Sequence, residues 1–131
     1  MEKLQEMIQT AVRAVNDKKA CDMELVRVGG LTTLTEYFLI CTGTSTPHVR
    51  ALADAVEKAV KETFDGRLPH HVEGYREGNW ILLDYGELLI HVFLAETRRF
   101  YSLERLWGDA PKEDLSRYLP EEEREPQGGE T

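Results

Sequence analysis

The sequence predicts a single-domain α/β protein in which helices cover a mixed sheet of roughly five strands. The chain has 131 residues, which is close to the usual size of one domain. Helical and strand-like hydrophobic patterns follow one another in the order α-β-β-α-β-β-β-α. This order contains one strand–helix–strand crossover and then a run of adjacent strands, so the sheet should combine parallel with antiparallel neighbours.

The N-terminal part should supply a helix and two strands. Apolar residues recur at helical spacing in the first segment and predict an amphipathic helix that ends near Asn16. Residues 23–28 alternate in polarity and predict a strand, which two glycines end. Residues 37–42 are apolar along their length, which is typical of a central strand that is covered on both faces.

The next segment has an unusually clear helix start. Ser45 or Thr46 can accept a hydrogen bond from an N-terminal amide, and Pro47 has the backbone torsion that the first helical position requires. Apolar residues at helical spacing continue from there, and Gly66 should end the helix. Residues 70–75 predict a weaker strand, which a turn separates from the following element.

Residues 80–93 predict a β-hairpin with its turn at Tyr85 and Gly86, because apolar strand-forming residues flank a glycine that can adopt positive φ. In that register Trp80 faces His91. Side chains alternate along each strand, so one hairpin face is purely aliphatic and belongs in the core: Ile81, Leu83, Leu88, Ile90 and Val92. The other face has a mixture typical of a recognition surface: Trp80, Leu82, Asp84, Leu89 and His91. A three-residue loop would change the register and mix the two sets.

Residues 97–106 predict the final helix, and Gly108 should end both this helix and the folded domain, residues 1–108. An aromatic stripe on this helix is expected to pack in the core: Phe100, Leu103 and Trp107. Residues 109–131 hold eight acidic and three basic residues. We interpret them as a solvated, disordered acidic tail.

Composition restricts the class of protein. The formal net charge of −8 and the lack of a basic stripe argue against direct binding of nucleic acid through its phosphates. No apolar run is long enough to cross a bilayer, and the N-terminus has neither a signal peptide nor a transit peptide, so the cytoplasm is the expected location. Cys41 lies in an apolar strand and forms no paired motif with Cys21, so a buried reduced thiol is favoured over a disulfide.

Catalytic and metal chemistry have little support in the sequence. The turn Gly43–Thr46 follows a buried strand and precedes a helix, where exposed amides can hold a phosphate, but it matches neither phosphate-binding glycine motif. We favour a capped turn there and keep a nucleotide-binding or nucleotidyltransferase-type enzyme as the alternative. Gly86 stands two positions after Asp84, so the paired carboxylates of a two-metal site are missing. The four histidines lack metal-ligand spacing, and no cofactor is predicted.

Three segments resemble those of a known family. They are I-C-T-G-T-S-T-P-H-V from Ile40, W-I-L-L-D-Y-G-E-L-L-I-H-V-F from Trp80, and R-R-F-Y-S-L-E-R-L-W-G-D-A from Arg98. In this order and spacing they resemble the ribosomal silencing factor family, also called Iojap-related proteins. The resemblance covers nearly all of residues 1–110 and leaves out only the acidic tail.

The resemblance implies a fold related to nucleotidyltransferases but without their activity, in agreement with the glycine at position 86. It implies binding to the large ribosomal subunit through ribosomal protein L-fourteen, on the face that meets the small subunit. Occupying that face would block subunit joining and lower translation when nutrients are short. The resemblance also implies that a homodimer can form and that the protein has no catalytic residue and no membrane partner.

The same motifs place the partner-binding surface on the hairpin. It would be centred on Trp80, Leu82, Asp84, Tyr85 and Gly86, with His91 and Phe93 beside it. The last motif adds the candidate contributors Arg98, Tyr101, Glu104 and Trp107. Trp80 and Tyr85 are expected to be exposed aromatic anchors, the residue type that dominates protein interfaces.

Overall fold

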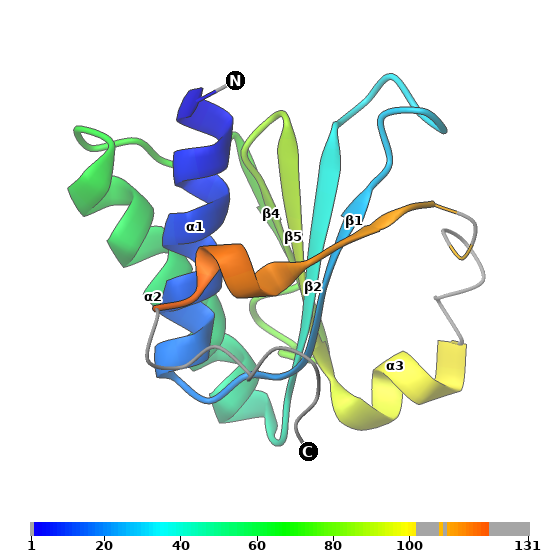
Figure 1. Ribbon diagram of the computed structural model, residues 1–131. Coiled ribbons are helices and arrows are strands. Elements are labelled where there is room, and N and C mark those ends of the chain that lie inside the picture. Colours follow the sequence, from blue (N-terminus) through cyan, green and yellow to red (C-terminus); the bar gives the residue numbers. More distant parts are fainter. Residues whose placement is uncertain (1, 102–107, 109, 121–131) are drawn as a thin grey trace, which may run out of the picture.

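The computed structural model of the protein describes residues 2–101, 108 and 110–120 (Figure 1). Three α-helices, six strands and one short 3-10 helix lie in this part of the chain. In chain order they are α1 (Glu2–Asp17), β1 (Cys21–Arg27), β2 (Tyr37–Gly43), α2 (Thr46–Thr63), β3 (His71–Glu73), β4 (Trp80–Asp84), β5 (Leu88–Leu94), α3 (Ala95–Tyr101), β6 (Lys112–Glu113) and η1 (Leu115–Tyr118).

The six strands form one mixed sheet in the order β3-β4-β5-β2-β1-β6. Only the central pair, β2 and β5, is parallel, and all other neighbours in the sheet are antiparallel. Helices α1 and α2 lie side by side on one face of the sheet, whereas α3 lies on the opposite side near one end (Figure 1). The predicted single-domain α/β fold with a mixed sheet is confirmed, with one more strand than expected. No helix of the described residues is long and apolar enough to span a bilayer.

The main core lies between the sheet and helices α1 and α2. It contains the apolar stripes of both helices and the aliphatic face of the hairpin, including Ile8, Val12, Leu52, Leu83 and Ile90, each with no exposed surface. Burying each such side chain contributes about 1.5–3 kcal/mol relative to its exposure to water. Cys41 is also in this core as a free cysteine, and burial raises the pKa of its thiol to about 12.

The predicted start of α2 is confirmed. The side-chain oxygen of Ser45 accepts a hydrogen bond from the amide of His48 at 3.2 Å, and Pro47 lies in the first turn. The helix ends as predicted before Gly66, which has a positive φ of 84°. This junction directs the chain from the centre of the sheet, at the end of β2, into the helix that covers it.

The hairpin turn lies at Gly86 and Glu87, so its predicted position at Tyr85 and Gly86 is wrong. Tyr85 donates its amide hydrogen to the oxygen of Leu88 at 3.0 Å, and Trp80 pairs with Phe93 instead of His91. Gly86 has a φ of +90°, which suits the first central position of a type II′ turn, and its amide donates to Asp84 Oδ1 at 2.8 Å. A shift of the pairing by an even number of residues leaves both predicted face sets intact.

The folded domain extends beyond Gly108, so the predicted boundary is also wrong. Strand β6 pairs with β1 through Val26 and Lys112, which gives the outer edge of β1 a hydrogen-bonding partner. Tyr118 is 5% exposed in the main core, and its backbone oxygen accepts a hydrogen bond from Arg13 Nε of α1 at 2.9 Å. Residues 121–131 lie outside the described residues, and a disordered acidic tail there stays a prediction.

Candidate docking face of the sheet

The face of the sheet opposite α1 and α2 has a half-buried area where partner binding is expected. Cross-strand pairing brings one set of side chains to this face, and we call this set the docking face: Phe38, Trp80, Leu82, Asp84, Leu89 and His91. All are partly exposed except His91, which is 7% exposed. The next side chains along the same face, Ile40 and Phe93, are fully buried in a second, smaller core cluster.

An aromatic cluster fixes the position of the indole in the docking face. Trp80 Nε1 donates a hydrogen bond to His91 Nδ1 at 3.1 Å. The ring of Phe38 meets the ring of His91 edge-on at 4.7 Å between centroids, and Trp80 packs on Phe93 at 4.9 Å. Such aromatic pairs add about 0.5–1.5 kcal/mol beyond the area that they bury. The face is therefore preorganised, which lowers the entropy lost when a partner binds.

The imidazole of His91 is held in its neutral form. Because Nδ1 accepts the hydrogen bond from Trp80, the proton of the neutral ring resides on Nε2. Burial lowers the pKa of His91 from 6.5 to about 4. The lowered value means that the unfolded chain binds this proton more readily than the folded protein between these two pH values.

We expect the free energy of unfolding to fall as the pH decreases from 6.5 to 4, by about 3 kcal/mol from His91 alone. Urea denaturation at a series of pH values measures this dependence. His91→Gln removes the titrating group, so the difference between the wild-type and variant curves isolates its contribution from that of the carboxylates. Parallel curves across this pH window would show that His91 titrates normally in the folded state.

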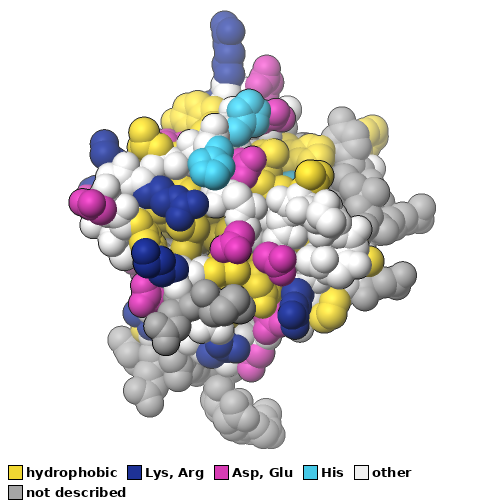
Figure 2. Space-filling view, turned by 90° about the horizontal axis from the view of Figure 1, so that it is seen from above, with side chains coloured by type: hydrophobic (Ala, Val, Ile, Leu, Met, Phe, Trp, Pro, Cys, Tyr) yellow, Lys and Arg dark blue, Asp and Glu magenta, His cyan; other side chains and the backbone are white. Residues whose placement is uncertain are grey.

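The hairpin end of the docking face is acidic. Asp84 accepts the Gly86 amide through one carboxylate oxygen, and on β3 the carboxylate of Glu73 lies 2.6 Å from His71 Nε2. The pairing of β3 with β4 places these side chains beside Leu82. Figure 2 views the molecule from this end and shows acidic and histidine side chains close to exposed hydrophobic ones. An apolar centre with an acidic rim is complementary to a basic protein surface.

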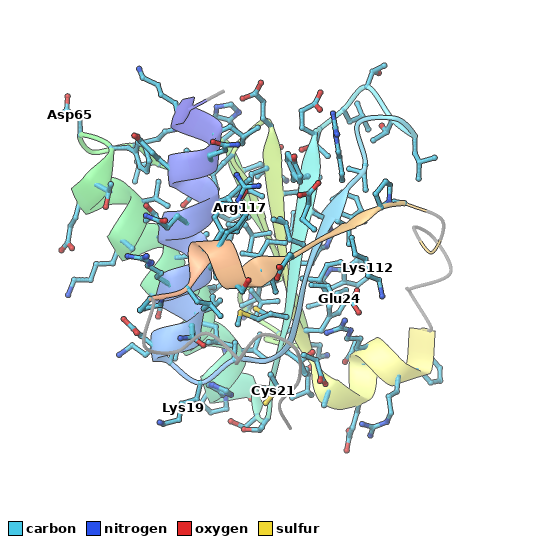
Figure 3. The ribbon with its side chains drawn as sticks, viewed as in Figure 1. Lys19, Cys21, Glu24, Asp65, Lys112 and Arg117 are labelled. Atoms are coloured by element: carbon cyan, nitrogen blue, oxygen red, sulfur yellow. The ribbon has the colours of Figure 1, made fainter. Side chains whose placement is uncertain are left out.

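Arg98 is a buried connection between three elements. It is 8% exposed, and its Nη1 donates to the backbone oxygen of Asp22 at 2.8 Å and to Thr42 Oγ1 at 2.7 Å. Its Nη2 lies 3.5 Å from Glu24 Oε2, and Glu24 also lies beside Lys112 of β6 (Figure 3). These contacts join α3 to β1 and β2, so the structure gives Arg98 a fold-supporting position.

We expect Arg98→Met to lower the free energy of unfolding by about 3 kcal/mol, because it leaves the buried oxygens around it without their donor. Thermal or urea denaturation measures the loss. Arg76→Met on the exposed β3–β4 connection is the matched control and should change stability by less than about 0.5 kcal/mol. An Arg98→Met variant as stable as the wild type would rule out this structural role.

The structure separates the predicted site residues into groups. Trp80, Leu82, Asp84 and His91 lie together on the docking face, with Gly86 in the adjoining turn. Tyr85 is 2% exposed on the core side, so its expected exposure is wrong, and Phe93 is buried beneath Trp80. Tyr101 is the last residue of α3, whereas Glu104 and Trp107 lie outside the described residues.

Phe38 is a member of the docking face that sequence reasoning missed. It lies on β2, pairs with Leu89 of β5, and is only half-buried. Strand β2 is apolar along its length, so its sequence does not show which side chains point to which face. The signal would have been the parallel pairing of β2 with β5, which no local pattern reveals.

The turn Gly43–Thr46 is held by hydrogen bonds to His48. The Thr44 amide donates to His48 Nδ1 at 2.9 Å, and the His48 amide donates to the Ser45 hydroxyl oxygen. A side chain at Gly43 would approach Val49 Cγ2 at 2.9 Å, so glycine allows the close contact between β2 and α2. These contacts favour a capped turn over a phosphate site. In the described residues no three His, Cys, Asp or Glu side chains gather as metal ligands would.

Comparison with known proteins gives consistent matches over the whole domain. The family model described as "Ribosomal silencing factor during starvation" matches residues 1–131. Ribosomal silencing factor RsfS of Halalkalibacterium halodurans is 40% identical over 111 residues, which cover 85% of this chain and 93% of that protein. The mouse protein named "Mitochondrial assembly of ribosomal large subunit protein 1" is 34% identical, covering 76% of this chain and 44% of the relative.

A crystal structure of a protein from Chromobacterium violaceum is similar in fold as well. Its TM-score is 0.74 at 35% identity, over 79% of this chain and 85% of that chain. The family match over all 131 residues, the identity to the RsfS relative and the shared fold agree with the three motifs of the sequence. The chain belongs to the ribosomal silencing factor family.

Proposed function

We propose that the protein binds the large ribosomal subunit through ribosomal protein L-fourteen and keeps the small subunit from joining. In the cytoplasm this would lower translation when nutrients are limited. The proposal depends on the docking face, where Leu82 and Leu89 lie beside Asp84. Next to them is an aromatic cluster with fixed geometry. The family description and the large-subunit name of the mouse relative support a ribosomal partner.

The proposed mechanism is steric and requires no covalent step. Leu82, Leu89 and Trp80 supply the apolar centre of the contact, while Asp84 and Glu87 supply negative charge at its rim. A basic ribosomal protein complements this charge, whereas the net charge of −8 disfavours contact with the surrounding ribosomal RNA. The helices behind the sheet then occupy space that the small subunit needs.

The experiment is sedimentation of the protein through sucrose with isolated large subunits, followed by a subunit-joining assay. We expect the protein to pellet with large subunits and to reduce the yield of joined ribosomes as its concentration rises. Pelleting without inhibition of joining would reject the steric mechanism, and failure to pellet would reject the partner.

We also propose that the free protein forms a homodimer through the same face. Dimer and ribosome would then compete for the docking face. Equilibrium sedimentation of the free protein measures self-association, and substitution of Leu82 should weaken it together with large-subunit binding. A dimer that Leu82 substitution leaves intact would show that copies associate elsewhere.

A further inference from the structure

A hollow lies where the start of β4 meets the first turn of α3, immediately beside the docking face. Its volume is about 440 Å³, and it is lined by Asn79, Trp80, Glu96, Thr97 and Phe100. This volume is within the range of sites for small ligands and single side chains. Of the five described residues that line it, only Trp80 was a predicted contact.

Two aromatic side chains from different elements form part of its wall. Phe100 on α3 is 79% exposed, so the prediction that it packs in the core is wrong. Such exposure is unusual for a large apolar ring. Trp80 on β4 is half-buried, and its indole is fixed by the hydrogen bond to His91 Nδ1 at 3.1 Å and by its contact with Phe93. The hollow therefore presents aromatic surface to solvent on a prearranged support.

The one charged side chain among the described residues of the hollow is the carboxylate of Glu96, whose negative charge suits a cation. Glu96 is exposed and lies one helical turn before Phe100, so the carboxylate and the ring are on the same side of α3. Asn79 and Thr97 add oxygen acceptors. No Lys or Arg of the described residues lines the hollow, and the guanidinium of the neighbouring Arg98 is directed to Asp22, Thr42 and Glu24 instead.

We propose that this hollow receives one Lys or Arg side chain of the basic ribosomal protein that binds the docking face. Aromatic rings attract a cation through the negative charge on their faces, and Glu96 adds a direct ionic contact. A planar guanidinium can in addition stack on the indole of Trp80, which favours Arg. The biological role of the hollow rests on the proposed ribosome binding, but its preference for a cation can be tested without ribosomes.

The first test uses N-acetyl-arginine amide as the probe and N-acetyl-citrulline amide as its uncharged match. Nuclear magnetic resonance of the Trp80 indole N–H, assigned with Trp80→Phe, follows binding. We expect a saturable shift of this resonance with the arginine probe and at least about 5-fold weaker binding of the citrulline probe. Glu96→Gln and Phe100→Leu should each weaken binding of the arginine probe by a similar factor. The lysine probe shows whether an ammonium is also accepted. Glu62→Gln on α2, an exposed acid outside the hollow, is the matched control and should bind as the wild type does.

Equal binding of arginine and citrulline, or binding that Glu96→Gln and Phe100→Leu leave unchanged, would overturn the cation site. The second test repeats large-subunit sedimentation with the same variants. We expect about 5-fold weaker association for Glu96→Gln and Phe100→Leu but not for Glu62→Gln. Normal association of both hollow variants would overturn the proposed role in partner binding. If no variant and no wild-type protein pellets, the ribosomal function itself fails, and the probe titration still decides whether the hollow selects a cation.

Discussion

Replacing Leu82 by Arg should weaken binding to large ribosomal subunits by about 30-fold or more, as expected for a residue at the centre of an interface. Leu82 is half-buried on β4, between Glu73 on β3 and the buried His91 on β5. A guanidinium there removes apolar contact and adds a charge of the same sign as the expected partner. Sedimentation with a series of subunit concentrations measures the change in affinity.

The matched control for this prediction is Leu68→Arg. Leu68 is 59% exposed, precedes β3 and is not a member of the docking face, so the same substitution should leave binding unchanged. Circular dichroism checks that both variants fold. Equal affinity of a folded Leu82→Arg variant and the wild type would show that the partner binds another surface.

Replacing Tyr85 by Ala should lower the free energy of unfolding by about 3–5 kcal/mol, the usual cost of deleting a large buried side chain. Tyr85 is 2% exposed in the main core, and Arg67 Nη2 donates to its backbone oxygen at 2.8 Å. Urea denaturation measures the loss. The expected result follows from the corrected hairpin turn, which moves Tyr85 out of the turn and into the core, immediately after β4.

Tyr85→Phe distinguishes packing from hydrogen bonding at this position. The phenol oxygen is buried without a hydrogen-bond partner in the described part of the chain, and burial is the main reason why the pKa of Tyr85 is raised. Removing an unpaired buried hydroxyl should leave stability unchanged or raise it slightly. Large-subunit binding should also be unchanged. A Tyr85→Phe variant that binds as weakly as Leu82→Arg would identify the phenol as a partner contact.

Elements with strong local signals could be predicted from the sequence. The start of α2 depends on Ser45 and Pro47, which act on amides within one helical turn, and the structure has the same cap. The two hairpin faces depend only on alternation, so they survived an error in the turn. That error arose because Gly86 could occupy either central position of a two-residue turn. In the structure it occupies the first, where its amide donates to the carboxylate of Asp84.

Features that depend on distant partners could not be predicted. Strand β6 has only two residues and forms because the outer edge of β1 is available for pairing. Phe38 lies on the docking face because β2 pairs with β5 there. The hollow is formed by residues of two elements, Trp80 of β4 and Glu96 and Phe100 of α3. The sequence therefore indicated which hairpin residues share the docking face, but it did not show the neighbours that complete it.

The parallel pairing of β2 with β5 has a consequence for the order of folding during synthesis. Tyr37 pairs with Leu88, and the remaining pairs continue to Gly43 with Leu94, so the centre of the sheet joins distant parts of the chain. Such long-range contacts form late, because a long loop must close before they give any stabilisation. Two members of the docking face come from these two strands, Phe38 from β2 and Leu89 from β5. A nascent chain therefore acquires the face only after Leu94 has left the exit tunnel, so an unfinished copy would lack the surface that we propose binds the large subunit.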